Sequence, residues 1–223
     1  EGNILREFYP DGALKSEAEV KEGKRHGRYR EYYENGKLKF RGKYANNQPK
    51  GTWKYYGDEE EPKLHTGWFE AVPSKELNSD DHENGTTHWY YANSKGEITI
   101  PTADGEVGVV KTIDGKSYLF NSDGEMVTGL RILTYDGSKI TNISSEVDSA
   151  DTVKNMNSDT MKLVYFESNG AAKTGTTTIT LDGTSYTFSF KSNGSPRGVG
   201  ETGISDGYIY QNGLRLTADE DTK

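Results

Sequence analysis

Hydrophobic and polar residues alternate along two stretches near the start of the chain, residues 14–21 and 37–44. One side of each stretch is apolar or small, and the other side is charged. The first stretch sets Leu14, Ser16, Ala18 and Val20 against Lys15, Glu17, Glu19 and Lys21, and the second sets Leu38, Phe40, Gly42 and Tyr44 against Lys37, Lys39, Arg41 and Lys43. A period of two is typical of a β-strand with one buried face. We therefore predict two half-buried strands here.

The two strands belong to a repeat with a spacing of 24 residues. Phe8-Tyr9 aligns with Tyr32-Tyr33, Asp11-Gly12 with Asn35-Gly36, and Tyr29 with Trp53. If the equivalent strands were direct neighbours, Glu17 would lie opposite Arg41 and Glu19 opposite Lys43. Opposite charges paired across strands stabilise a sheet. We predict that the two strands are neighbours in this register.

Tight-turn signals recur along the whole chain. Asn-Gly occurs five times and Asp-Gly seven times, and both dipeptides favour the positive φ angles of hairpin turns. We predict an all-β fold, an elongated and solenoid-like array of tandem β-hairpins. Most of its core should come from stacking between successive repeats.

Composition indicates what fills that core and which classes of protein are excluded. Leu, Ile, Val and Phe make up only 39 of 223 residues, whereas Tyr alone contributes 15, so aromatic rings must supply much of the buried area. The absence of Cys excludes thiol catalysis, disulfides and Cys-ligated metals. No apolar run approaches the ~18 residues of a membrane span. A net charge of −8 argues against a nucleic-acid partner.

The first part of the chain resembles the bacterial variant of the MORN repeat. The resemblance is carried by Gly27-Arg-Tyr-Arg-Glu-Tyr-Tyr-Glu-Asn-Gly36-Lys-Leu38 and by Gly51-Thr-Trp53-Lys-Tyr-Tyr56, and it covers residues 5–57. It implies β-hairpin units that stack into an extended sheet.

A charged segment separates this part from the rest. Residues 58–63 begin with Asp-Glu-Glu-Glu-Pro and are predicted to form an acidic linker. The formal charge changes from +2 over residues 1–63 to −10 over residues 64–223. We predict MORN-like repeats over 1–57, a second repeat type over 64–217 and an acidic tail over 218–223.

The second part resembles the cell-wall-binding repeats of choline-binding and glucan-binding proteins, which are found on secreted proteins of Gram-positive bacteria. The resemblance covers residues 66–216. Its best copy is Thr112-Ile-Asp-Gly-Lys-Ser-Tyr118-Leu-Phe120-Asn-Ser-Asp-Gly124-Glu-Met126-Val-Thr-Gly129, and Val164-Tyr-Phe166-Glu-Ser-Asn-Gly170-Ala-Ala-Lys-Thr-Gly175 repeats it 46 residues later. Gly67-Trp68 with Trp89-Tyr90-Tyr91 is similar to an earlier copy.

In the choline-binding family the ligand lies in an open box of aromatic rings between consecutive hairpins. Carried over to this chain, the family pattern implies ligand-contact positions at Trp68, Trp89, Tyr90 and Tyr91. The later Gly-Trp positions read Gly108-Val109, Gly129-Leu130 and Gly175-Thr176, so at most one choline site is expected. Most other rings, such as Tyr118 with Phe120 or Tyr208 with Tyr210, are spaced two residues apart, as expected for strand residues that face the core.

Two insertions interrupt the repeats, at residues 70–88 and 136–162, and residues 145–156 of the second could form a short helix. The first contains Asp80-Asp-His-Glu-Asn84, which we interpret as a solvated, turn-forming loop because its spacing does not match a calcium loop. Gly198-Val-Gly-Glu-Thr-Gly203 spells a nucleotide-binding fingerprint but precedes a hairpin rather than a helix. We predict no catalytic residue, no metal ligand and no cofactor.

The sequence is thus interpreted as a non-catalytic, extracellular binding module on a bacterial cell surface. Its expected partner is a cell-wall polymer or glycan, with no nucleic acid and no membrane insertion. The alternative is a protein–protein interaction scaffold in which the MORN-like sheet binds a protein and the later repeats act as a spacer. An enzyme with its active site in the insertions is the third possibility.

Overall fold

The computed structural model describes residues 3–57, 64–73, 75, 78–193 and 197–217. The chain divides into two compact units, residues 1–104 with 120–126, and residues 105–119 with 127–223. The predicted segments 58–63 and 218–223 lie outside the described residues, and the predicted change of repeat type falls inside the first unit. The four predicted segments and their boundaries therefore stay predictions.

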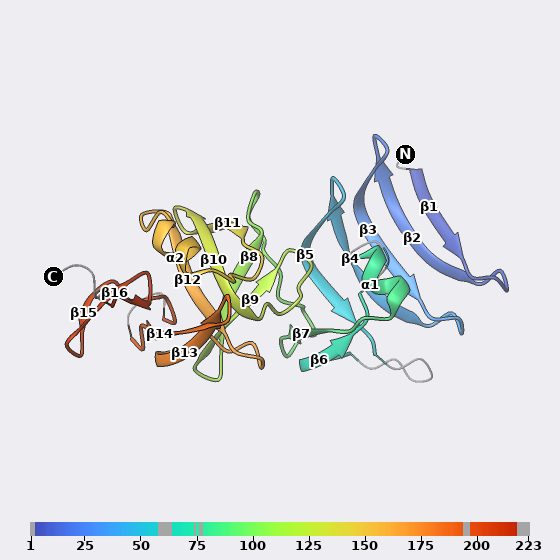
Figure 1. Ribbon diagram of the computed structural model, residues 1–223. Coiled ribbons are helices and arrows are strands. Elements are labelled where there is room, and N and C mark those ends of the chain that lie inside the picture. The colour runs from blue at the N-terminus through green and yellow to red at the C-terminus, as the bar shows by residue number, and fades with distance from the viewer. Residues whose placement is uncertain (1–2, 58–63, 74, 76–77, 194–196, 218–223) are drawn as a thin grey trace. The chain divides into compact units, whose positions relative to one another are not determined.

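The first unit begins with a five-stranded antiparallel sheet in which neighbouring strands follow chain order (Figure 1). Its strands are β1 (Asn3–Phe8), β2 (Leu14–Lys21), β3 (Lys24–Tyr32), β4 (Leu38–Ala45) and β5 (Gln48–Tyr55). The unit continues with β6 (Gly67–Ala71), the short helix α1 (Ser79–Asn84) and β7 (His88–Ala92), and β6 and β7 form a separate two-stranded sheet.

The 24-residue repeat is visible in matching hydrogen bonds. The Tyr9 hydroxyl donates to the carbonyl of Tyr32 at 2.7 Å, and the Tyr33 hydroxyl donates to the carbonyl of Tyr56 at the same distance. A register shift also recurs, after Glu7 in the first copy and after Glu31 in the second. The predicted MORN-like hairpins are therefore confirmed as structurally equivalent units.

The predicted neighbouring of the two equivalent strands is wrong. The strand β3 lies between β2 and β4, because each repeat is a complete hairpin whose second strand separates it from the next copy. Glu17 consequently lies opposite Arg30 and accepts a hydrogen bond from its guanidinium at 3.1 Å. Glu19 accepts from the Arg28 guanidinium at 2.7 Å and from the Arg28 backbone N–H at 2.8 Å.

The core of the first unit consists mainly of aromatic rings from successive hairpins. Phe69 stacks on Tyr55 with centroids 5.3 Å apart, and on Tyr90 at 5.6 Å. On the same sheet face, Trp53 packs edge-on against Tyr44 at 5.1 Å. These contacts confirm that rings of one hairpin are buried against rings of the next, as the aliphatic-poor composition requires.

The second unit contains two further antiparallel sheets, of strand order β12-β10-β11-β8-β9 and β13-β14-β17-β16-β15. The strands of the first are β8 (Gly108–Ile113), β9 (Lys116–Asn121, whose last two residues belong to the first unit), β10 (Gly129–Asp136), β11 (Lys139–Ile143) and β12 (Met161–Phe166). Those of the second are β13 (Gly175–Leu181), β14 (Thr184–Phe190), β15 (Gly203–Ser205), β16 (Tyr208–Gln211) and β17 (Leu214–Arg215).

Hairpin turns form at several of the Asn-Gly and Asp-Gly signals, whereas Asn84-Gly85 ends α1. Asp114, Asp182 and Asp206 each have φ near +50°, and the glycine that follows each of them is also positive, as type I′ turns require. Isolated bridges pair Ala92 with Ile98, Phe120 with Met126 and Phe166 with Ala172, always six residues apart. The bridges of Phe120 and Phe166 lie at equivalent positions, which confirms the likeness of the repeat copies over residues 112–129 and 164–175.

The short helix expected within residues 145–156 is present as α2 (Ala150–Asn155), and it is capped by Ser149 rather than Ser145. Its buried residues Ala150 and Val153 join the core of the second unit, in which Phe188 and Phe190 are fully buried. Tyr208 departs from the predicted core pattern because it is 50% exposed, under the guanidinium of Arg215.

Candidate ligand-binding face

The β6–β7 hairpin places the predicted contact residues on two different faces. Trp68 lies directly opposite Tyr91, and Glu70 lies opposite Trp89. Because side chains alternate along a strand, these four residues share one face of the ribbon. The other face carries Phe69, Ala71, Tyr90 and Ala92, all of which are buried.

Trp68 is held in place by two neighbouring rings. Tyr91 meets it edge-on at 5.1 Å, and Phe120 stacks on it at 5.8 Å with an interplanar angle of 28°. Phe120 is fully buried, so Trp68 is supported from the interior by a ring of a later hairpin within the first unit. The half-buried Trp68 ring is therefore fixed in position by packing against Tyr91 and Phe120.

Trp89 is the exposed aromatic residue of this face. Its residue is 43% exposed, although its backbone is fixed by β7 and its carbonyl accepts a hydrogen bond from the N–H of Met126 at 2.8 Å. Trp89 is diagonal to Trp68 across the ribbon, a separation that aromatic side chains can bridge. A large ring held open to solvent on a rigid strand is suited to stacking against a ligand.

Tyr90 does not belong to this face. It is 4% exposed and stacks on Phe69 inside the core. Burial, together with the nearby carboxylates of Glu125, Asp123 and Asp81, raises the pKa of its hydroxyl far above the usual value. The candidate face therefore consists of Trp68, Trp89 and Tyr91, with Glu70 as a residue that sequence reasoning missed but that the period of two identifies.

The later positions of the family pattern carry no equivalent face. Leu130 occupies one Gly-Trp position and is 1% exposed in the core, and Thr176 occupies another. A different hollow of about 660 Å³ lies in the second unit. Its lining mixes half-buried Tyr135 with acidic and basic side chains, which are Glu106, Asp159, Lys162 and Arg197.

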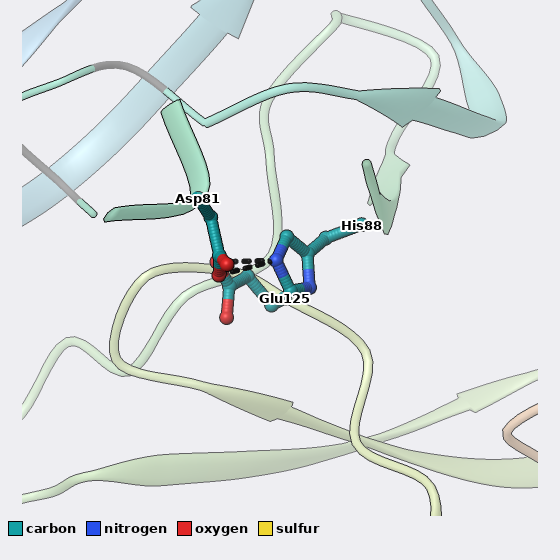
Figure 2. A group of neighbouring side chains, drawn as sticks. All are labelled: Asp81, His88 and Glu125. Atoms are coloured by element: carbon teal, nitrogen blue, oxygen red, sulfur yellow. Dashed lines mark hydrogen bonds and ion pairs between the residues drawn. The ribbon is translucent and has the colours of Figure 1, made fainter. Parts of the chain in front are cut away.

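A group of polar side chains lies on the core side of the same hairpin. Asp81 from α1, His88 from β7 and Glu125 from the turn after β9 converge within the first unit (Figure 2). Near them, burial and the charge of Glu125 raise the pKa of Asp123 to about 6. The segment interpreted as a solvated loop, Asp80–Asn84, instead lies within α1 and contributes Asp81 to this group.

Comparison with known proteins gives matches for each part of the chain. The MORN repeat variant matches residues 25–46. Choline binding protein F from Streptococcus pneumoniae is 18% identical over 97% of this chain and 58% of its own, with a TM-score of 0.46. CbpJ from Streptococcus pneumoniae TIGR4 is 17% identical over 96% of this chain and 70% of its own, with a TM-score of 0.28.

Another structure of choline binding protein F, determined in the presence of a peptidoglycan analogue, gives a TM-score of 0.44 at 18% identity, with 97% and 58% of the two chains covered. The chain thus spans 58% of the length of choline binding protein F. No curated protein sequence matches it. Both resemblances identified from the sequence recur in these comparisons.

Proposed function

We propose that the chain is a non-catalytic, extracellular binding module that attaches to a bacterial cell-wall polymer or glycan. The observation that carries the proposal is the aromatic face of the β6–β7 hairpin, where exposed Trp89 lies beside the supported ring of Trp68. Neither described helix is long and apolar enough to cross a membrane.

The chemistry of this face fits a sugar ring or a quaternary ammonium group. A sugar ring stacks its C–H face on an indole, and the Glu70 carboxylate opposite Trp89 can accept hydrogen bonds from hydroxyl groups. A quaternary ammonium is attracted to the same rings by about 0.5–2 kcal/mol each, and the Glu70 charge adds to that attraction. Single sites of this kind are weak and gain strength when the polymer presents many copies.

Binding of the full chain to purified cell walls tests the proposal. The Trp89→Ala variant should bind walls at least about tenfold more weakly, because the exposed ring of the face is removed. Phe8→Ala is the matched control, since Phe8 is an aromatic residue of the same unit that is 59% exposed on β1, away from the aromatic face. Equal binding by wild type and Trp89→Ala would overturn the proposal.

Competition then separates the two ligand types. Soluble wall fragments without choline should displace the chain if the ring stacks on sugar, whereas choline alone should displace it if the cation is recognised. Displacement by choline with a stoichiometry above one per chain would contradict the expectation of a single choline site.

One observation favours a protein–protein scaffold as the second candidate. Like charges oppose each other across β4 and β5, with Arg41 opposite Lys54 and Lys43 opposite Lys50. Such pairs destabilise a sheet, so their presence is suited to an acidic partner. If this candidate is correct, Arg41→Glu with Lys43→Glu will abolish partner capture, and Trp89→Ala will leave it intact.

A further inference from the structure

We propose that Asp81, His88 and Glu125 form a binding site for a divalent transition-metal cation, with Zn²⁺ as the best-matched ion. The inference is independent of the proposed wall binding, because it concerns the core side of the β6–β7 hairpin. The three residues come from the insertion, from β7 and from the turn after β9, all within the first unit. A cation here would connect α1 and β7, which are close in sequence, to the later turn after β9.

The donor atoms are already close to coordinating positions. His88 Nε2 lies 2.8 Å from Asp81 Oδ2 and 3.8 Å from Glu125 Oε1, and all three donors lie within 4.8 Å of one another. Figure 2 shows both carboxylates directed at the same imidazole nitrogen. Tetrahedral bonds of ~2.0–2.1 Å place donors about 3.3 Å apart, and both distances from His88 Nε2 lie within about half an ångström of that value.

Glu125 supplies the observation that points to a ligand. The residue is 8% exposed, and its Oε1 atom has no hydrogen-bond donor. Its other oxygen, Oε2, accepts from the amide of Asn121 at 2.9 Å. Among the described residues no lysine or arginine pairs with Glu125. A buried carboxylate oxygen without a donor costs free energy unless a cation or a proton compensates it.

In the described part of the chain, a second turn with the same Asn–Glu hydrogen bonds forms without an aspartate and a histidine like Asp81 and His88 beside its glutamate. Asn93 and Glu97 repeat the hydrogen bonds of Asn121 and Glu125, with side-chain and backbone distances of 2.7 and 3.0 Å. Glu97 does not belong to the Asp81–His88–Glu125 group. The Glu125 turn therefore differs from the Glu97 turn in the histidine and aspartate that face it.

The two carboxylates are pre-oriented by neighbouring amides. Asn78 caps α1 by accepting from the N–H of Asp81, and its own amide donates to Asp81 Oδ2 at 2.6 Å. Asn121 holds Glu125 in the corresponding way. Partners of this kind fix the direction of metal ligands and raise the affinity of the site.

The donor set selects the class of ion. One imidazole nitrogen and two carboxylate oxygens suit Zn²⁺ and neighbouring divalent transition metals, whereas Ca²⁺ and Mg²⁺ prefer oxygen donors alone. The side chains of His88 and Asp81 are 26% and 28% exposed, which leaves a path for the ion and room for a water in the fourth position.

Thermal unfolding and titration calorimetry of the untagged full chain with ZnCl₂ test the inference. Wild type should bind one Zn²⁺ per chain, and its Tm should rise with metal concentration up to about 100 µM because the ion binds only the folded state. Glu125→Gln and His88→Gln should each bind Zn²⁺ at least about tenfold more weakly. Glu97→Gln is the matched control and should bind like wild type.

Two results would overturn the inference: no Zn²⁺-dependent heat or Tm shift in wild type, or equal weakening by Glu97→Gln and Glu125→Gln. Co²⁺ provides a measurement that does not depend on the folding of variants. Visible d–d absorption of Co²⁺ bound to wild type, displaced by Zn²⁺, supports the site, and its absence counts against it.

Discussion

Single residues in the two MORN-like copies are matched in volume across the sheet. In the first copy Tyr29 lies opposite Ala18, and in the second the larger Trp53 packs over Gly42. A Cβ atom added to Gly42 would overlap the Trp53 ring, although the backbone there is not in the left-handed region. The glycine is therefore explained by the ring that covers it.

Gly42→Ala should lower the free energy of unfolding by about 1–3 kcal/mol, because the added methyl group displaces the Trp53 ring. Adding Trp53→Tyr should restore part of the loss, since it recreates the Ala–Tyr pair of the first copy. Denaturant unfolding of the two single variants and the double variant measures this. If the loss of stability in the double variant equals the sum of the losses in the two single variants, the two positions are not coupled.

His65 is a second residue with a clear physical consequence. Its ring packs nearly parallel to those of Tyr55 at 5.2 Å and Phe69 at 4.7 Å, and burial lowers the pKa of its imidazole below the usual value near 6.5. The unfolded chain thus binds the proton more tightly than the folded chain. Stability should fall as the pH drops from about 6.5 through the folded pKa.

His65→Phe keeps the ring stack and removes the titration. The variant should lose this part of the pH dependence of Tm, while its Tm above pH 7 stays close to that of wild type. Proton NMR should place the His65 midpoint below about 6.5. A midpoint at or above that value would contradict the burial argument.

Among the elements, the hairpin is the unit that sequence periodicity identifies most securely. The alternation over residues 14–21 predicted a strand, and Asn35-Gly36 predicted the turn that precedes the next one. Which strands become neighbours was predicted wrongly, because the charges of Arg30 and Arg41 both complement Glu17. Only chain connectivity decides that β3 is the partner.

A double-mutant cycle tests the observed register. Glu17 and Arg30 should show a coupling energy of about 0.2–1 kcal/mol, typical of a partly exposed ion pair, and Glu17 and Arg41 should show none. Chemical unfolding of Glu17→Gln, Arg30→Gln, Arg41→Gln and the two doubles provides the values. Coupling to Arg41 alone would favour the register that the structure rejects.

At the scale of the whole molecule, the all-β class and the aromatic core were predictable, because few aliphatics and many tyrosines leave ring stacking as the way to bury area. The exposed aromatic face at Trp89 could be predicted from the sequence only in part. Sequence placed Trp68, Trp89 and Tyr91 in one repeat, but only the register separates them from buried Tyr90.

The Asp81–His88–Glu125 group could not be predicted from the sequence. Its members lie in an insertion, a strand and a later turn, and no spacing rule connects them. The sequence also gives no sign that residues 120–126 belong to the first unit, although the residues on either side of them belong to the second. Both depend on the contact of the turn after β9 with earlier segments of the chain, about which local periodicity carries no information.

Fluorine NMR of the chain labelled with 5-fluorotryptophan tests the central claim most directly, since the protein has three tryptophans in three environments. During a titration with soluble peptidoglycan fragments, the Trp89 resonance should shift saturably, and that of Trp53, which is 2% exposed in the core, should stay in place. An unmoved Trp89 resonance at saturating fragment would contradict the assignment of this face as the ligand-binding site.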